Sequence, residues 1–81
     1  MQVVVRFFAR ARDLAGADQR SLELPEGANV TQLRDALFEA IPSLKPLSRG
    51  LLVAVNNDYA SDDKPLLTTD EIACFPPVSG G

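Results

Sequence analysis

The sequence contains no histidine, no tryptophan and a single cysteine among its 81 residues. Without histidine, the chain lacks the side chain that most often acts as a general base near neutral pH and most often binds metals. One cysteine cannot form an internal disulfide, and we expect Cys74 to be a small core residue. The composition therefore argues against a self-contained active site or metal site, and it fits a reducing, cytoplasmic location.

Other common features are also missing. Gly16, Gly27 and Gly50 stand alone, so no glycine-rich phosphate loop is present. No apolar run approaches the roughly 20 residues of a membrane span, and residues 1–9 lack the basic segment of a signal peptide. A net charge of −3 offers no electrostatic basis for binding nucleic acid or anionic lipid. We expect neither nucleic acid nor a membrane as a partner.

The residues that are present predict one small α+β domain, with 46% hydrophobic and 23% charged residues. β-Branched residues, aromatic residues and alternation of polar and apolar residues predict strands over 3–9, 21–24, 51–55, 59–60 and 71–75. Asn29 and Gln32 form a capping-box pair before a helix that ends at Pro42. Residues 13–16 are expected to form a turn and residues 42–50 a loop. The single helix would cover one face of a sheet of four to five strands.

The other face of the sheet is expected to carry aromatic residues. Arg6 and Glu71 mark this outer face on the first and last strands, because charged side chains avoid the core. Alternation then places Phe8 and Phe75 outward as well. If these strands are neighbours, the two rings form an exposed patch of the kind found at protein interfaces. The alternative is that a slip or bulge returns one ring to the core.

The sequence closes on residues 76–81, PPVSGG, which are expected to form an extended tail after a domain spanning 1–75. Two prolines remove consecutive backbone donors and end strand pairing. Glycines without side chains fit a channel too narrow for any β-carbon. The carboxylate of Gly81 is the one reactive group at the tip, and we expect it to be the working part of the protein.

Four segments, at 7–16 (FFARARDLAG), 54–56 (AVN), 70–73 (DEIA) and 75–81 (FPPVSGG), together resemble the MoaD family, the small subunits of molybdopterin synthase. The similarity covers nearly the whole chain and is weakest at residues 40–50. The resemblance implies a ubiquitin-like β-grasp fold, in which the first and last strands are neighbours. It also implies a sulfur carrier in molybdenum cofactor biosynthesis and not a catalytic subunit.

The resemblance further implies how such a carrier works. An E1-like (MoeB-like) enzyme uses ATP-Mg to adenylate Gly81, and a persulfide donor converts it to a thiocarboxylate. The tail then enters the large catalytic (MoaE-like) subunit, in a heterotetramer, and gives sulfur to a pterin precursor. The chain itself is expected to bind no cofactor and no metal. Gly80 and Gly81 are the expected reacting end, and the expected partner-binding residues are Phe8, Arg12, Tyr59, Phe75, Pro76, Pro77, Val78 and Ser79.

Two other functions remain open from the sequence. The same activated end could serve thiazole or tRNA thiolation, or join the chain to lysines of other proteins as a modifier. A plain binding module, in which the two glycines are only a frayed terminus, is the third hypothesis. The aromatic pair beside the tail favours the pterin role over the other uses of the activated end, and dual use stays open.

Overall fold

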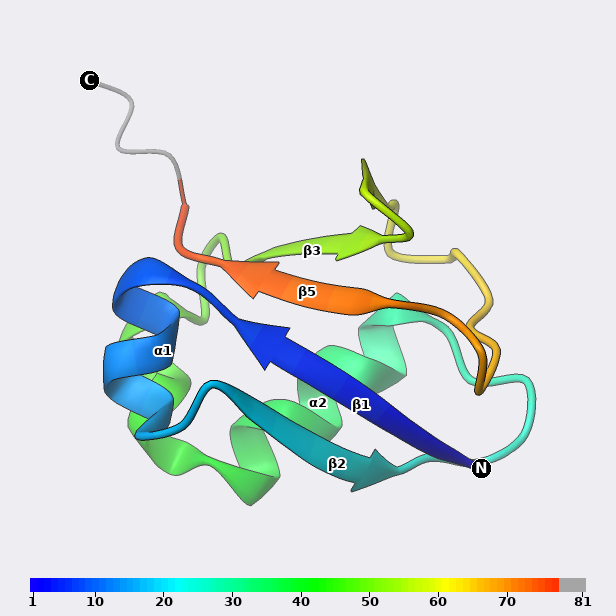
Figure 1. Cartoon of the computed structure of the whole chain (residues 1–81), viewed down its shortest axis with the longest axis horizontal. Helices are drawn as coiled ribbons and strands as arrows, with labels where there is room; N and C mark the ends of the chain where they lie inside the picture. Colours follow the sequence, from blue (N-terminus) through cyan, green and yellow to red (C-terminus); the bar gives the residue numbers. More distant parts are fainter. Residues whose placement is uncertain (78–81) are drawn as a thin grey trace.

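The computed structural model describes residues 1–77, so Val78, Ser79, Gly80 and Gly81 lie outside the described residues. The elements in chain order are strand β1 (Gln2–Phe7), helix α1 (Ala9–Ala15), strand β2 (Gln19–Glu23), helix α2 (Val30–Ala40), 3₁₀ helix η1 (Pro42–Leu47), and strands β3 (Leu52–Val55), β4 (Asp58–Tyr59) and β5 (Ile72–Phe75). The five strands form one sheet in the order β2-β1-β5-β3-β4 (Figure 1).

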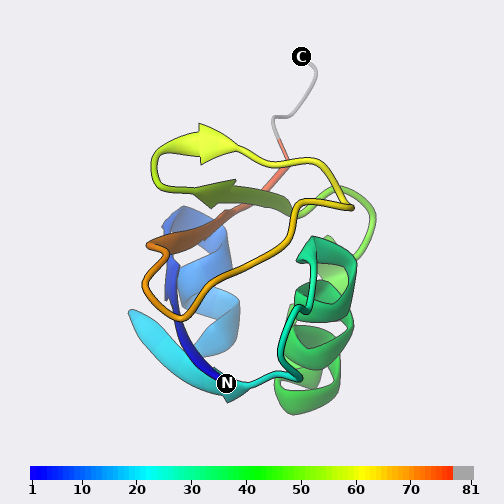
Figure 2. The same ribbon diagram turned by 90° about the vertical axis from the view of Figure 1, so that its right-hand side faces the viewer.

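The sheet is mixed, because β1 and β5 run parallel at its centre while the other neighbouring strands run antiparallel. Helix α2 crosses one face of this sheet, and α1 packs at the end of the same face (Figure 2). This is the β-grasp arrangement that the resemblance implies. The expected pairing of the first and last strands is confirmed.

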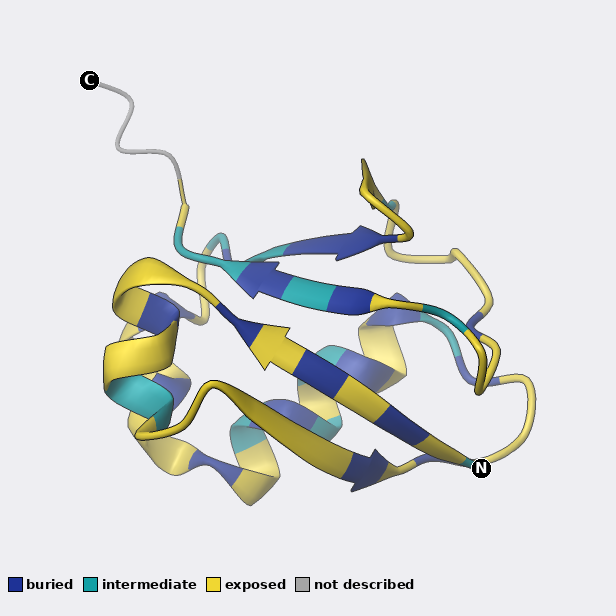
Figure 3. Ribbon diagram, in the orientation of Figure 1, coloured by how far each residue is buried: buried dark blue, intermediate teal, exposed yellow. Residues whose placement is uncertain are grey.

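The core lies between the sheet and the helices. Along β1, Val3, Val5 and Phe7 are buried and the residues between them are exposed, so the colour alternates in Figure 3. On β5, Ile72 and Cys74 point into the same core. Burying these apolar side chains removes them from water and is the main force that holds the two layers together. The expected inward and outward faces of both strands are therefore confirmed.

Local signals also behave as the sequence predicts at two places. The Asn29 side chain accepts a hydrogen bond from the Gln32 N–H at 3.0 Å, and the Gln32 side chain accepts one from the Asn29 N–H at 3.0 Å. This capping box starts α2. Asn56 and Asn57 both have positive φ, at 52° and 73°, and they form the two-residue turn between β3 and β4.

Three segments differ from expectation. The first strand ends at Phe7, not at residue 9, because Ala9 adopts a positive φ of 53° and turns the chain into α1. The expected turn at 13–16 is the end of that helix, where Gly16 donates its N–H to the Arg12 carbonyl at 2.9 Å. Residues 42–50 are not an open loop either, because η1 buries Leu44 and Leu47 against the core.

Candidate functional site

Phe8 and Phe75 lie side by side on the outer face of the sheet. The parallel register pairs Phe7 with Cys74, so the next residue of each chain segment falls on the opposite face. The Phe8 N–H donates to the Cys74 carbonyl at 3.1 Å and fixes this alignment beyond the end of β1. The two rings stack with centroids 5.0 Å apart and planes 11° from parallel. A slip or bulge that would bury either ring has not occurred.

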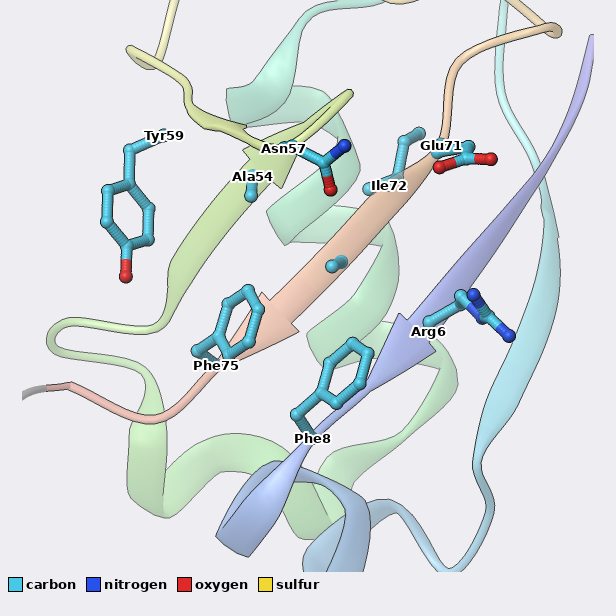
Figure 4. Close-up of a pocket in the computed structure, with 9 residues that line it drawn as sticks. Arg6, Phe8, Ala54, Asn57, Tyr59, Glu71, Ile72 and Phe75 are labelled. Atoms are coloured by element: carbon cyan, nitrogen blue, oxygen red, sulfur yellow. The ribbon is translucent and has the colours of Figure 1, made fainter.

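Tyr59 adds a third ring from the edge strand β4. Its centroid is 6.4 Å from that of Phe75, and the two planes stand at 80°, which is an edge-to-face contact. Tyr59 is 71% exposed and Phe8 is 42% exposed, so the rings are available to another molecule. We call Phe8, Tyr59 and Phe75 the aromatic patch. Figure 4 shows the three side chains rising from three different strand ends on the same face.

The aromatic patch borders a cavity of about 280 Å³. Its floor is formed by the small side chains Ala54 and Ala73, which are paired across β3 and β5. Arg6 and Glu71 stand at the end away from Tyr59, on β1 and just before β5 (Figure 4). The cavity is therefore apolar at one end and carries one charge of each sign at the other. Sequence reasoning named the two charged residues as face markers but did not find the alanine floor.

Hydrogen bonds beside the cavity hold the edge of the sheet in place. The Asn56 side chain accepts from the Glu71 N–H at 2.9 Å and donates to the Asp70 carboxylate at 2.9 Å. The same carboxylate accepts the Leu67 N–H at 2.8 Å. These bonds link the β3–β4 turn to the chain that enters β5. They hold β5, which carries Phe75, against β3 and β4, of which β4 carries Tyr59.

Arg12 is not part of this cavity. It lies in the last turn of α1, and its Nη1 atom is 3.6 Å from an oxygen of Asp18. With 57% of the Arg12 side chain and 83% of the Asp18 side chain exposed, this ion pair contributes little to folding. Arg12 is therefore an exposed residue of α1 that does not line the cavity.

The tail begins directly after Phe75. Pro76 is half-buried and Pro77 is exposed, and neither belongs to a strand. The expected partner-binding residues Val78 and Ser79 and the expected reacting residues Gly80 and Gly81 lie outside the described residues. The structure thus brings Phe8, Tyr59, Phe75 and the first tail residue together at the end of β5.

Cys74 is not a functional thiol of this surface. It points into the core, and burial raises the pKa of its thiol from 9.0 to about 12, although the charge of Arg34 acts in the opposite direction. A thiol with that pKa is almost entirely protonated near neutral pH and is a poor nucleophile. The expectation that Cys74 is a small core residue is confirmed.

Residues 1–77 also bear on metal binding and membrane insertion. No group of three or more histidine, cysteine, aspartate or glutamate side chains in this part of the chain could hold a metal ion. No helix formed by these residues is long and apolar enough to cross a membrane.

Comparison with known proteins identifies the family. The model of the ThiS family matches residues 5–81. The chain belongs to the ThiS family. Its relatives include the molybdopterin synthase sulfur carrier subunit of Arabidopsis thaliana, which is 35% identical over 81 residues that cover 100% of this chain and 84% of the relative. The resemblance to the small subunits of molybdopterin synthase is thereby confirmed.

Solved structures extend this ThiS-family assignment. Small archaeal modifier protein 1 (SAMP1) of Haloferax volcanii superposes with a TM-score of 0.86, is 28% identical, and covers 100% of both chains. A chain in a complex of subunits 1 and 2 of the molybdopterin-converting factor of Helicobacter pylori superposes with a TM-score of 0.70, is 27% identical, and covers 100% of both chains. The β-grasp fold is thus shared with proteins that are described in different roles.

Proposed function

We propose that this chain is the sulfur carrier subunit of a molybdopterin synthase and that it delivers sulfur for molybdenum cofactor biosynthesis. Full-length identity of 35% to a sulfur carrier subunit is the observation that carries this proposal. The position of the aromatic patch supports it, because an exposed apolar surface directly before the tail lets a partner hold the domain and receive the tail together.

The reacting group in this proposal is the carboxylate of Gly81. A free carboxylate resists nucleophiles, so its oxygen first attacks the α-phosphorus of ATP in an E1-like enzyme, and pyrophosphate leaves. The terminal sulfur of a persulfide then attacks the acyl carbon, forming a C–S bond while the C–O bond to AMP breaks. A second thiol then attacks the donor's sulfur, so that a new disulfide joins that thiol to the donor, the S–S bond to the acyl group breaks, and the thiocarboxylate leaves. Magnesium and ATP belong to the activating enzyme in this scheme.

The folded domain has a supporting role in this chemistry. The chain has no histidine, and its only cysteine is a buried, protonated thiol, so neither is placed to supply a base or nucleophile at neutral pH. We therefore propose that acids, bases and the pterin site lie on the large subunit. The Helicobacter pylori complex of subunits 1 and 2 supports pairing with such a subunit. A heterotetramer with two of each chain, and a cytoplasmic location, are part of the same proposal.

Intact mass spectrometry tests the sulfur carrier function. The chain is incubated with the E1-like enzyme, ATP and a persulfide source, and the expected result is replacement of one oxygen by sulfur at Gly81. Omission of ATP is the control and should leave the mass unchanged. Addition of the large subunit and the pterin precursor should then restore the carboxylate. A chain that stays unmodified in the complete mixture would refute the proposal.

A role as a protein modifier is the second candidate. The similarity to SAMP1 of Haloferax volcanii over the whole chain supports it, because that protein is described as a modifier. The modifier role begins with the same adenylate but ends in an amide bond to a lysine. Adducts of this chain on lysines of other proteins, found after ATP-dependent incubation, would favour that candidate. Loading with sulfur and transfer to a thiazole or tRNA precursor would instead favour the other thiolation pathways.

A further inference from the structure

Gly50, in the segment between η1 and β3, lies so close to Pro77 of the tail that an added β-carbon would contact the proline ring. From this contact we infer that Gly50 is a positioning residue that fixes where the tail leaves the domain. The inference rests on the proposed function, because it concerns the delivery of Gly81 to a partner.

The backbone register explains why these residues meet. Strands β3 and β5 are antiparallel, and Leu52 is paired with Phe75. Gly50 lies two residues before Leu52 and Pro77 lies two residues after Phe75, so the same antiparallel register brings Gly50 opposite Pro77. Pro77 has no N–H and cannot donate to a strand ladder, so the ladder ends while the two backbones remain adjacent. The ring of Pro77 then occupies the space where a side chain at position 50 would stand.

A side chain at position 50 would fit only if Pro77 shifted by a few tenths of an ångström. A β-carbon at position 50 would lie 3.0 Å from the Pro77 Cβ atom and 3.6 Å from its Cγ atom. The φ of Gly50 is 144°, a conformation that residues with side chains rarely adopt. Gly16 and Gly27 also have positive φ, but a β-carbon at either position would meet nothing within 4 Å. Among these three glycines, close approach to another segment is therefore particular to Gly50.

The segment that holds Gly50 is itself anchored. Leu47 and Leu51 on either side of it are buried in the core. The Leu51 N–H donates to the Leu47 carbonyl at 3.0 Å, and the Ser48 N–H donates to the Lys45 carbonyl at 2.9 Å. A segment with two buried side chains and these hydrogen bonds cannot yield easily to a new β-carbon. Pro77 is the exposed partner, so it is the residue that would be displaced.

The contact limits the greatest distance from the domain at which Gly81 could lie. Counted from Phe75, the six residues to Gly81 span at most about 20 Å, whereas the four residues after Pro77 span at most about 14 Å. The volume open to the tip scales with the cube of this length, so holding Pro77 reduces it by about threefold. Holding Pro77 should therefore raise the local concentration of the reacting end at a docked partner by about threefold.

Steady-state kinetics of thiocarboxylate formation by the E1-like enzyme test this inference. Gly50→Ala is compared with wild type and with Gly27→Ala, a control in which the glycine also has a positive φ, of 78°, but no neighbour to displace. Both variants should lower the thermal unfolding midpoint. Only Gly50→Ala should lower kcat, by about threefold, with KM unchanged because the aromatic patch still docks. Equal kcat values for Gly50→Ala and Gly27→Ala would overturn the inference.

A second variant separates contact from strain and remains informative if Gly50→Ala fails to fold. Pro77→Gly removes both atoms that the new β-carbon would meet, so it should lower kcat about threefold while leaving the unfolding midpoint unchanged. Adding Gly50→Ala to it should lower kcat no further; additive losses would overturn the inference. In the wild type, a nuclear Overhauser contact between Gly50 and the Pro77 ring is expected. Its absence would overturn this inference but leave the proposed function untouched. A wild type that gains no sulfur would overturn the proposed function as well.

Discussion

Replacing Phe75 by alanine should weaken binding to the large subunit while the domain remains folded. Phe75 contacts both other rings of the aromatic patch, at centroid distances of 5.0 Å to Phe8 and 6.4 Å to Tyr59. Central aromatic residues of an interface typically contribute about 2 kcal/mol or more to binding. The expected result is a rise of about thirtyfold in the Kd for the large subunit.

The effect on stability is of similar size, because Phe75 is half-buried. A fully buried phenylalanine loses about 3–5 kcal/mol on truncation to alanine, so roughly half of that, about 2 kcal/mol, is expected here. For a domain of this size, such a loss lowers the unfolding midpoint by about 8–16 °C. The variant should therefore remain folded at 25 °C, and its affinity can be measured by isothermal titration calorimetry.

Phe38→Ala is the matched control. Phe38 is also half-buried and packs against the core from helix α2, on the side of the sheet away from the aromatic patch. Its truncation should lower the unfolding midpoint by a similar amount and leave the Kd unchanged. If both variants weaken binding equally, or if Phe75→Ala leaves affinity intact, the outer face is not the surface that meets the large subunit.

Three further predictions concern the fold. Asn56→Ala removes the hydrogen bonds to Glu71 and Asp70 and should lower the free energy of unfolding in urea by about 1–2 kcal/mol. A loss below about 0.5 kcal/mol would contradict the idea that these hydrogen bonds hold the edge of the sheet in place. Asn29→Ala removes the helix cap, and its midpoint by circular dichroism should fall by about 4–8 °C; no fall would contradict the capping role. Because burial raises the pKa of Cys74 to about 12, the folded state keeps a proton that the unfolded chain loses above about pH 9. Stability should therefore decline between about pH 9 and 12, by up to about 1.4 kcal/mol per pH unit, and Cys74→Val should lack this part of the decline in urea titrations.

The faces of the sheet could be predicted from the sequence because one charged residue on each central strand identifies the outer side. Arg6 and Glu71 did this for β1 and β5, and the alternation of side chains then placed Phe8 and Phe75 correctly. The capping box at Asn29 was equally clear, because both of its partners lie within one helical turn. Such signals depend only on neighbours in sequence.

Helix α1 could not be predicted in this way. The aromatic run at the end of β1 favours continuation of the strand, and nothing in the sequence marks Ala9 as a residue of positive φ. The helix has only seven residues, of which Ala11 alone is fully buried, so it shows no apolar stripe. Its position is set by packing against η1 and β5, which the sequence does not display.

The contacts of Tyr59 and Gly50 depend on strand register. Tyr59 reaches Phe75 because a two-residue turn pairs it with Ala54, which is itself paired with Ala73. Register across three strands is a tertiary property, so the sequence suggested the residue types but not their distances. The same holds for Gly50 and Pro77, which are adjacent only because β3 and β5 share one register.

Strand β5 joins the two parts of the proposed function. Its last residue, Phe75, belongs to the aromatic patch, and the tail starts at the next residue. A partner that binds the patch therefore also fixes the origin of the tail, with no intervening linker whose flexibility would blur the distance. Since six residues span at most about 20 Å, any centre that reacts with Gly81 must lie within that distance of the site that receives Phe75. This limit applies equally to an adenylating enzyme, a pterin site and a lysine acceptor. One docking surface could therefore serve all three partners only if each of them places its reacting centre within that distance of the site that receives Phe75.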